Sequence, residues 1–139
     1  MLTIGLLAAL VFAPTPVIAA TCSGADPAIT HVSASQPTTD AAGVNHYTLS
    51  ITVTNLGDRK QTSNLLQSVQ IWEDRQKVDQ KGIPPLAPDQ SYRFSYNTPR
   101  NSDAAMGSTR FDFRLVVSNP LPVGWQDCNG GNDRATLTI

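Results

Sequence analysis

One segment of the sequence, residues 47–54, constrains the fold more strongly than any other. Its odd positions carry Tyr, Leu, Ile and Val, and its even positions carry Thr or Ser. Side chains on a β-strand alternate between two faces, so this order predicts a strand with one buried face and one wet face. No segment has the spacing of a well-formed amphipathic helix, and the chain is therefore expected to consist of strands.

Further segments of the chain have the alternation or the β-branched and aromatic content of strands. The expected strands are 28–35, 68–73, 91–97, 110–118 and 134–139, with a short, charged edge strand near 77–80. Parallel sheets need crossover helices, which the sequence does not offer. The prediction is an all-β fold, an antiparallel immunoglobulin-like or fibronectin-III-like β-sandwich of about seven strands.

The first twenty residues predict an export signal. Leu2 to Val11 is apolar, Pro14 and Pro16 interrupt it, and small residues follow up to Ala20. The apolar run is shorter than the ~20 residues of a transmembrane helix. We therefore expect a signal peptide over residues 1–20, a single domain over residues 21–139, no transmembrane anchor, and secretion or a periplasmic location. The absence of a basic residue before the apolar run is unusual for such a signal.

The two cysteines, Cys22 and Cys128, permit a single pairing. An even number of cysteines in an exported chain favours a disulfide, and this one would join the new N-terminus to the start of the last strand. The competing role for Cys22 is lipid attachment, because residues 19–22 faintly resemble a lipoprotein cleavage site. Thr21 is unfavourable in such a site, so we expect the disulfide.

Charge and motifs exclude several classes of protein. Ten Lys and Arg against eleven Asp and Glu give a net charge of −1, whereas a nucleic-acid binder needs a basic surplus or stripe. The two histidines, His31 and His46, are too few for a zinc site. No motif of a hydrolase, a metalloprotease, a phosphate-binding loop or a redox dithiol occurs. The chain is predicted to be no enzyme and to need no cofactor.

Two tryptophans are the candidate binding residues. Trp72 is opposite in phase to Val69 and Ile71, so it should point away from the core, where it could stack on a sugar or anchor a partner. The alternative is that a bulge breaks the phase and brings Trp72 into the core. Trp125 follows a loop rich in Pro and Gly, and it either caps the end of the sandwich or forms a platform for a ligand.

Short motifs rich in Asn, Asp, Gly and Pro occur at the predicted strand ends. They are Val53-x-Asn55-x-Gly57, then Leu86-x-Pro88 followed by Asp89, and then Asp127, Asn129 and Asn132 before the last strand. In this order they resemble the CARDB family, the bacterial cell-adhesion-related domain of the immunoglobulin-like type, over about residues 26–139. Asp89 stands where that family usually has Gly, and Gly130 and Asp133 also depart from its pattern. The resemblance implies an exported interaction module without catalytic activity.

We expect such a module to bind a protein or a glycan of the cell envelope or the exterior. The alternatives are a domain that binds a small carbohydrate or other ligand, and a structural accessory subunit of an envelope complex. Asp127, Asn129 and Asp133 offer the oxygen ligands that calcium prefers, but they lack the spacing and the closing Glu of an EF-hand. A hydrogen-bonded turn without metal is therefore expected there.

Overall fold

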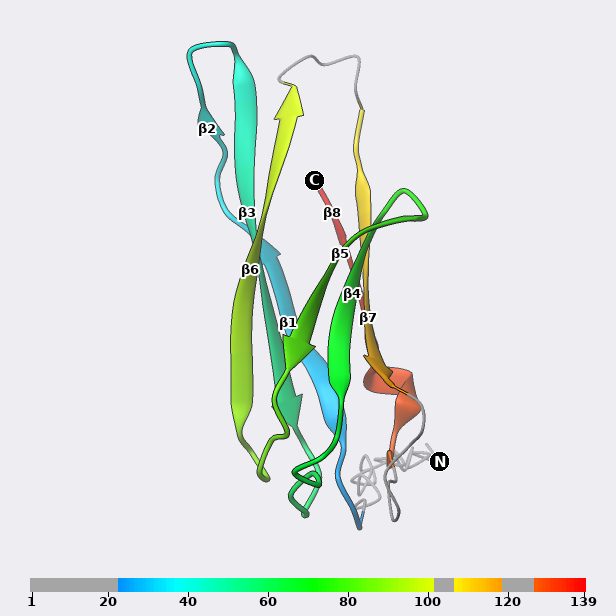
Figure 1. The fold of residues 1–139 in the computed structure, drawn as a ribbon. Helices are drawn as coiled ribbons and strands as arrows, with labels where there is room; N and C mark the ends of the chain where they lie inside the picture. Colours follow the sequence, from blue (N-terminus) through cyan, green and yellow to red (C-terminus); the bar gives the residue numbers. More distant parts are fainter. Residues whose placement is uncertain (1–22, 102–106, 119–126) are drawn as a thin grey trace, which may run out of the picture.

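A computed structural model describes residues 23–101, 107–118 and 127–139 of the chain. These residues form two antiparallel sheets that pack face to face, as Figure 1 shows. The segment predicted as a signal peptide, Cys22 and Trp125 lie outside the described residues.

The first sheet is built around β3, and its strands are β1 (Pro27–Ala34), β2 (Thr38–Thr39), β3 (Val44–Asn55) and β6 (Ser91–Asn101). β3 pairs with β6 along its whole length, and its other side pairs with β1 and then with β2. The second sheet has the order β5-β4-β7-β8, with bounds β4 (Gln67–Glu73), β5 (Gln76–Ile83), β7 (Arg110–Val117) and β8 (Arg134–Thr138). Every adjacent pair is antiparallel.

The predicted β-sandwich is confirmed, and each expected strand has a counterpart in the described part of the chain. The two-residue β2 is the strand that the sequence did not indicate. Within β3 the alternation of residues 47–54 has the expected result, because Leu49, Ile51 and Val53 are fully buried. A turn of 3-10 helix, η2 (Gly130–Asn132), precedes β8.

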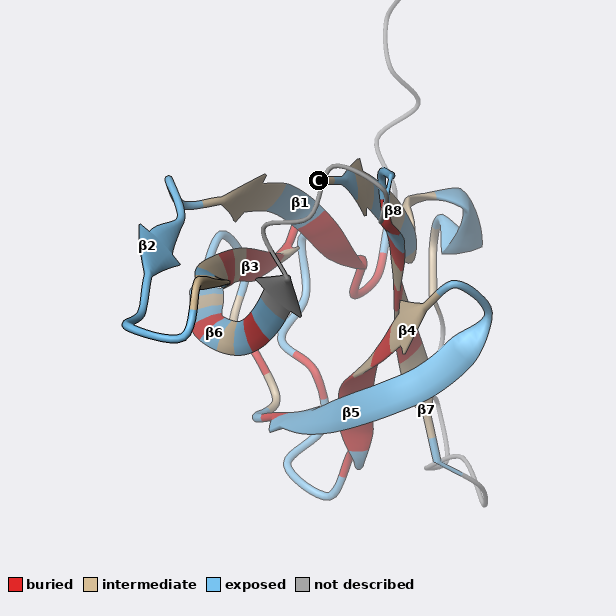
Figure 2. Ribbon diagram, turned by 90° about the horizontal axis from the view of Figure 1, so that it is seen from above, coloured by how far each residue is buried: buried red, intermediate tan, exposed pale blue. Residues whose placement is uncertain are grey.

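The core lies between the two sheets and is made of aliphatic and phenylalanine side chains from both. Its buried members are Ile29, Leu49, Ile51, Val53, Val69, Ile71, Ile83, Leu86, Phe94, Phe111, Phe113 and Leu115. Figure 2 shows buried residues in red along β1, β3, β4 and β7. Burial of each of these large side chains contributes about 1.5–3 kcal/mol before conformational entropy is subtracted.

β5 is an edge strand, and residues 76–82 are exposed to solvent (Figure 2). Three of them, Lys77, Asp79 and Lys81, are charged. Charges on an edge strand discourage the addition of a further strand from another molecule. The charged edge expected from the sequence is therefore present in the fold.

A buried carboxamide ties the strand ends together at one end of the sandwich. The Asn55 Oδ1 atom accepts hydrogen bonds from the amides of Asp26 (2.9 Å) and Gly57 (3.1 Å). Its Nδ2 atom donates to the carbonyl oxygens of Arg59 (2.8 Å) and Leu86 (3.0 Å). Asn55 has no exposed surface, so every one of these bonds replaces a bond to water.

The neighbouring turn explains two further residues of the motifs. A Cβ atom on Gly57 would lie 2.7 Å from the Asp26 amide nitrogen, so a side chain does not fit there. Asp89 has a φ of 60°, and its amide donates to the Asn55 carbonyl oxygen at 2.8 Å. Glycine is favoured in this left-handed region, and Asp tolerates it better than most residues do.

Candidate functional site

Trp72 points away from the core. The pairing of β4 with β7 runs without interruption from Gln67 to Glu73, so Trp72 keeps the phase opposite to Val69 and Ile71, which are fully buried. A bulge does lie beside it, but its extra residue is Val78 in β5. The alternative in which a bulge carries Trp72 into the core is therefore wrong.

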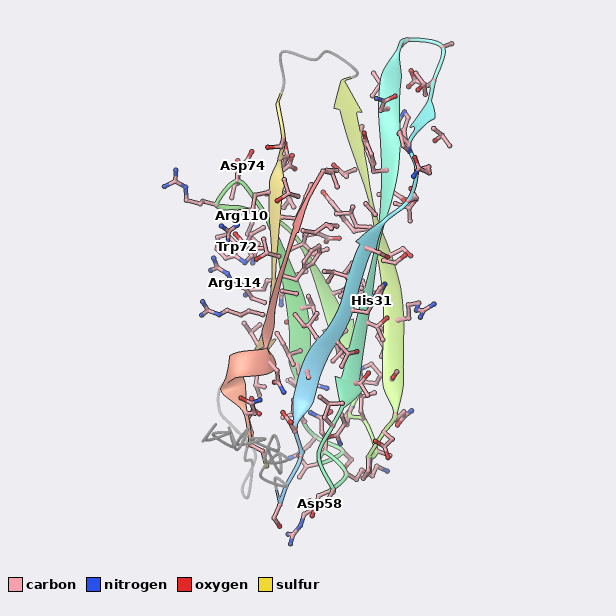
Figure 3. All side chains as sticks on the ribbon, turned by 180° about the vertical axis from the view of Figure 1, so that it is seen from behind. His31, Asp58, Trp72, Asp74, Arg110 and Arg114 are labelled. Atoms are coloured by element: carbon pink, nitrogen blue, oxygen red, sulfur yellow. The ribbon has the colours of Figure 1, made fainter. Side chains whose placement is uncertain are left out.

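The Trp72 side chain is held by two neighbours on the outer surface of the sheet. The guanidinium carbon of Arg114 lies 4.5 Å from the centre of the indole ring, a cation–π arrangement. The indole Nε1 donates to Gln70 Oε1 at 3.2 Å. Figure 3 shows Trp72 and Arg114 on the side of the sheet that faces away from the other sheet.

Two more arginines share this outer surface, in β7 and β8. Arg110 binds Asp112 Oδ1 through Nε (3.1 Å) and Nη2 (2.9 Å), and Thr136 Oγ1 donates to the same oxygen at 3.1 Å. Arg134 is exposed and lies directly opposite Arg114 in the register of β8 with β7. The sheet therefore presents positive charge beside a single tryptophan.

The turn between β4 and β5 adds a fourth arginine. Asp74 and Arg75 both have positive φ values, 43° and 75°. The turn is tied to β7, because the Asp74 amide donates to the Arg110 carbonyl oxygen at 3.1 Å and the Arg110 amide donates to Asp74 Oδ1 at 3.3 Å. We call the surface that carries Trp72, Arg75, Arg110, Arg114 and Arg134 the arginine face.

Two hollows lie on the arginine face and have Arg110 and Asp112 in common. The first, of about 470 Å³, is lined by these two residues together with Asp74 and Arg75. The second, of about 180 Å³, runs between β7 and β8 and is also lined by Arg114 and Arg134. The arginine face is thus a shallow, charged surface that an extended ligand could follow.

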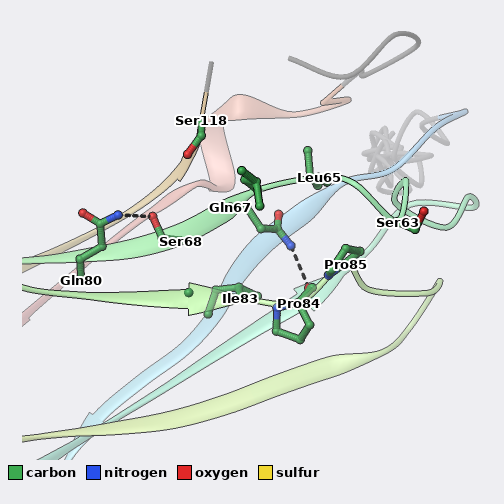
Figure 4. Close-up of a pocket in the computed structure, with 11 residues that line it drawn as sticks. Ser63, Leu65, Gln67, Ser68, Gln80, Ile83, Pro84, Pro85 and Ser118 are labelled. Atoms are coloured by element: carbon green, nitrogen blue, oxygen red, sulfur yellow. Dashed lines mark hydrogen bonds between the residues drawn. The ribbon is translucent and has the colours of Figure 1, made fainter. Parts of the chain in front are cut away.

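A separate groove of about 630 Å³ lies where β4 and β5 meet the loops at one end of the sandwich (Figure 4). Its polar groups bind one another: Gln80 Nε2 donates to Ser68 Oγ at 2.9 Å, and Gln67 Nε2 donates to the Pro84 carbonyl oxygen at 3.0 Å. The exposed Leu66 lies on its rim. The groove has no charged side chain in its lining, whereas four arginines line the two hollows of the arginine face, so the arginine face offers more to a charged ligand.

The predicted turn at residues 127–133 is closed by its own side chains. Asp127 Oδ1 accepts from the Asn129 amide at 3.0 Å, and Asn129 Oδ1 accepts from the Gly131 amide at 3.2 Å. Asn132 Nδ2 donates to Asp26 Oδ1 at 3.0 Å, which joins the turn to the segment before β1. These bonds direct the chain into β8. Gly130 and Gly131 keep φ values outside the left-handed range, so the turn does not use that freedom.

Asp133 lies among other carboxylates in the same turn. Partial burial, together with a hydrogen bond and the charge of Asp127, raises the pKa of Asp133 from 3.8 to about 7, and the charge of Asp26 adds to the rise. Asn132 Oδ1 and Asp133 Oδ1 are buried without a hydrogen-bond partner. Within the described ranges, no three His, Cys, Asp or Glu side chains are grouped closely enough to hold a metal ion.

The two histidines lie apart on the first sheet. His31 is exposed on β1 and pairs in register with Thr52, while His46 is exposed at the start of β3. His46 Nε2 lies 2.8 Å from Asp40 Oδ2. This contact and a bond from the Val44 amide hold the pKa of Asp40 below its usual value.

The geometry around Cys128 is compatible with the expected disulfide. The Cys128 amide lies 3.3 Å from the Ala25 carbonyl oxygen, and its Sγ atom would lie 3.1 Å from a Cβ built on Gly24. The cysteine is therefore next to the segment that follows Cys22. Since Cys22 is outside the described residues, the pairing stays a prediction.

Two solved structures resemble this arrangement of strands. The crystal structure of the CARDB domain of the PF1109 protein from Pyrococcus furiosus, in complex with di-metal ions, has a TM-score of 0.58 and 16% identity. The comparison covers 86% of this chain and 94% of that one. The chain has the fold of a CARDB domain.

The solution structure of the same Pyrococcus furiosus CARDB domain gives a TM-score of 0.55 with 16% identity, covering 84% of this chain and 94% of that one. At this identity the likeness establishes the CARDB fold alone. No protein-family model matches the sequence, and no curated protein is significantly similar to it. In the part of the chain that the structure describes, no helix has the length and apolarity needed to cross a bilayer.

The arginines of the CARDB sandwich are functional candidates that the sequence did not single out. Arg110 and Arg114 have the same parity as Asp112, which indicates one shared face of a strand. Their proximity to Trp72 and Arg134 depends on β7 lying between β4 and β8. Strand order is not visible in a local pattern of residues.

Proposed function

We propose that the chain is an exported, non-enzymatic interaction module that binds a protein or a glycan of the cell envelope or the exterior. The contact surface is the arginine face. The observation that carries this proposal is the outward Trp72 with Arg114 stacked over its ring, beside three further arginines. A partly exposed aromatic ring next to guanidinium groups is typical of residues that dominate binding energy.

Export is supported by the sequence of residues 1–20 and by the setting of Cys128 near Gly24. We propose a Cys22–Cys128 disulfide in the mature protein. Intact mass after alkylation checks it: the unreduced protein should take up no alkyl group, and the reduced protein should take up two. Alkylation of both cysteines without reductant would contradict the disulfide.

Affinity capture tests the proposed function. The oxidised mature domain, residues 21–139, is immobilised and exposed to solubilised envelope and secreted fractions of the source cell. Trp72→Ala, Trp125→Ala and Arg93→Gln are run in parallel, where Arg93 is an exposed arginine on the outer side of the first sheet. We expect a component that wild type and Arg93→Gln retain and Trp72→Ala loses. Trp125→Ala shows whether the second tryptophan takes part.

Circular dichroism keeps this result interpretable, because every variant must give the wild-type spectrum before it is compared. Equal retention by a folded Trp72→Ala would exclude the arginine face as the contact surface. Turnover of a retained component by the wild-type domain would contradict the non-enzymatic part of the proposal.

A further inference from the structure

The arginine face concentrates positive charge on a chain that is slightly acidic as a whole. Four of the ten basic residues lie on it, against two carboxylates, Asp74 and Asp112. The whole chain has a net charge of −1, so the charge of the arginine face is opposite in sign to that of the chain. A local surplus of one sign steers ligands of the opposite sign toward it.

Arg114 and Arg134 form a pair of like charges in neighbouring strands. They are register partners, and they line the same hollow between β7 and β8. Among the described residues no carboxylate lies within ion-pair distance of either guanidinium. Like charges placed directly opposite each other destabilise a sheet. An anionic group bound between them would remove this repulsion.

Arg75 occupies a position that favours glycine. Its φ of 75° lies in the left-handed region, which is unfavourable for a residue with a side chain. In a two-residue hairpin turn of this kind the second position is commonly Gly. The side chain of Arg75 lines the hollow that Arg110 also lines. Glycine would avoid this backbone strain, and strained residues of this kind are typical of functional sites.

Trp72 acts on this surface through Arg114. The indole lies 4.5 Å from the guanidinium carbon and is itself fixed by Gln70. A guanidinium that stacks through its flat face keeps its N–H edge for hydrogen bonds. Trp72 is thus a positioning residue for Arg114.

The polar composition of the surface around Trp72 favours a glycan over a protein as the ligand. The centre of a protein interface is usually apolar, whereas the side chains around Trp72 are polar or charged. Arg114 and Arg134 can each bind a carboxylate through two parallel hydrogen bonds, whereas Arg110 already binds Asp112 through Nε and Nη2. Gln70 and Thr136 lie beside them. Gln70 Nε2 can donate to a sugar hydroxyl and Thr136 Oγ1 can accept from one, because only Gln70 Oε1 and the Thr136 hydroxyl proton are used by Trp72 and Asp112.

We propose that the arginine face binds a carboxylate-bearing polysaccharide, a chain that contains uronic acid units. This inference rests on the proposed function and specifies the class of its ligand. The carboxylates bind between Arg114 and Arg134 and near Arg75, in the two hollows whose linings share Arg110 and Asp112. The ligand lies along the sheet surface, across β4, β7 and β8.

The first test uses three probes of similar chain length: oligogalacturonate, neutral dextran and poly-L-glutamate. Calorimetry with the mature domain should show binding of oligogalacturonate and no binding of dextran. Arg114→Gln should weaken that binding about tenfold, the scale of one lost charge-assisted contact. Arg93→Gln, the matched control on the other sheet, should bind as wild type does.

The second test separates folding from binding. Arg75→Gly relieves an unfavourable φ and should raise the melting temperature, yet it should weaken oligogalacturonate binding because a charge is lost. Trp72→Ala should weaken binding in the wild-type background and change it little in Arg114→Gln. Trp72→Phe, which keeps an aromatic face for Arg114, should recover part of the affinity.

Each contrary result overturns a defined part of the inference. Binding of dextran as strongly as oligogalacturonate would refute recognition of carboxylates while leaving a glycan-binding module in place. Preference for poly-L-glutamate would assign the surface to an acidic polypeptide. If none of the three probes binds but capture from envelope fractions still depends on Trp72, then the polyuronate inference is wrong and the interaction module stands.

Discussion

The two sheets share one core, but their outer surfaces differ. The outer side of the first sheet carries short hydroxyl side chains that bind each other: Thr54 Oγ1 lies 2.9 Å from Thr30 Oγ1 and 2.8 Å from Ser91 Oγ. The outer side of the second sheet is the arginine face, where Arg114 and Arg134 have no such partners among the described residues. The hydroxyl cluster of the first surface is paired within itself, whereas Arg114 and Arg134 on the second surface have capacity left for a ligand.

The difference shows how little the core dictates about the outer faces. In both sheets, alternate residues of the central strands β3, β4 and β7 supply apolar side chains to the core, so both obey the same constraint on the inside. On the outside, selection can place either hydroxyls that stabilise the sheet or charges that do not. The contrast predicts that stability and binding depend on different surfaces.

The largest effect on stability is expected at Asn55, whose hydrogen bonds join strand ends of both sheets. Asn55→Ala would remove four hydrogen bonds to backbone groups, three of them buried and one partly buried, and should lower the free energy of unfolding by about 3 kcal/mol or more. Urea denaturation measures this loss. Asn97→Ala removes an exposed contact with Thr48 and serves as the control, with an expected loss below about 1 kcal/mol. Oligogalacturonate affinity of the folded Asn55→Ala fraction should stay unchanged.

Salt should act on the arginine face alone. Raising the salt from about 50 to about 200 mM should weaken oligogalacturonate binding by about tenfold, because mobile ions compete for the guanidinium groups. The melting temperature should change little over the same range. Calorimetry at several salt concentrations gives the slope, and Arg134→Gln should make it shallower. A slope that is the same in this variant would show that Arg134 does not take part.

A third prediction concerns Asp133, which lies where the segment before β1 meets the one before β8. Its folded-state pKa of about 7 exceeds the ordinary 3.8, so the folded state holds the proton more tightly than the unfolded state does. The resulting stabilisation is fully present below about pH 3.8 and is lost as the pH rises toward about 7.

Asp133→Asn should therefore remove this dependence and raise stability near pH 8 by about 1 kcal/mol, less than the full shift implies because water screens the group. Thermal melts across this pH range measure it, with calcium added as a second condition. A melting temperature that rises with calcium in wild type and not in Asp133→Asn would show that a cation, rather than a proton, relieves the repulsion.

The smallest effect is expected on the hydroxyl surface of the first sheet. Thr54→Val keeps the β-branched shape and removes the contacts with Thr30 and Ser91. Both contacts are exposed, so water can replace them, and the loss should stay below about 1 kcal/mol. Urea denaturation checks this value. A larger loss would mean that the hydroxyls act as a cooperative network, and binding of oligogalacturonate should be unaffected in either case.

The sequence predicted the strands because their signal is local. The alternation in residues 47–54 needs no knowledge of the neighbours of β3. The phase of Trp72 against Val69 and Ile71 indicated its outward direction in the same way, but the alternative of a bulge could be excluded only from the register of β4 with β7. β2 was missed because two exposed threonines carry no alternation.

The arginine face could not be predicted, since its residues come from β4, β7, β8 and a turn. Their juxtaposition depends on strand order and register, and a shift of one residue in β8 would direct Arg134 to the core side. The left-handed φ of Arg75 was also hidden, because Asp74-Arg75 is not a usual sequence for such a turn. The role expected for Trp125 stays a prediction.

The Asn55 carboxamide also has a consequence for the order of folding events. It joins β3 to the Asp26 amide, 29 residues earlier, and to the Leu86 carbonyl, 31 residues later. These hydrogen bonds can form only after both distant segments have reached β3. Bringing the segments together costs loop-closure entropy, and the hydrogen bonds offset this cost only late in folding. Asn55 should thus have a low φ-value: its replacement should accelerate unfolding and leave the refolding rate nearly unchanged. The hydrogen bonds of Asn55 then determine how long the domain stays folded, because they slow its unfolding.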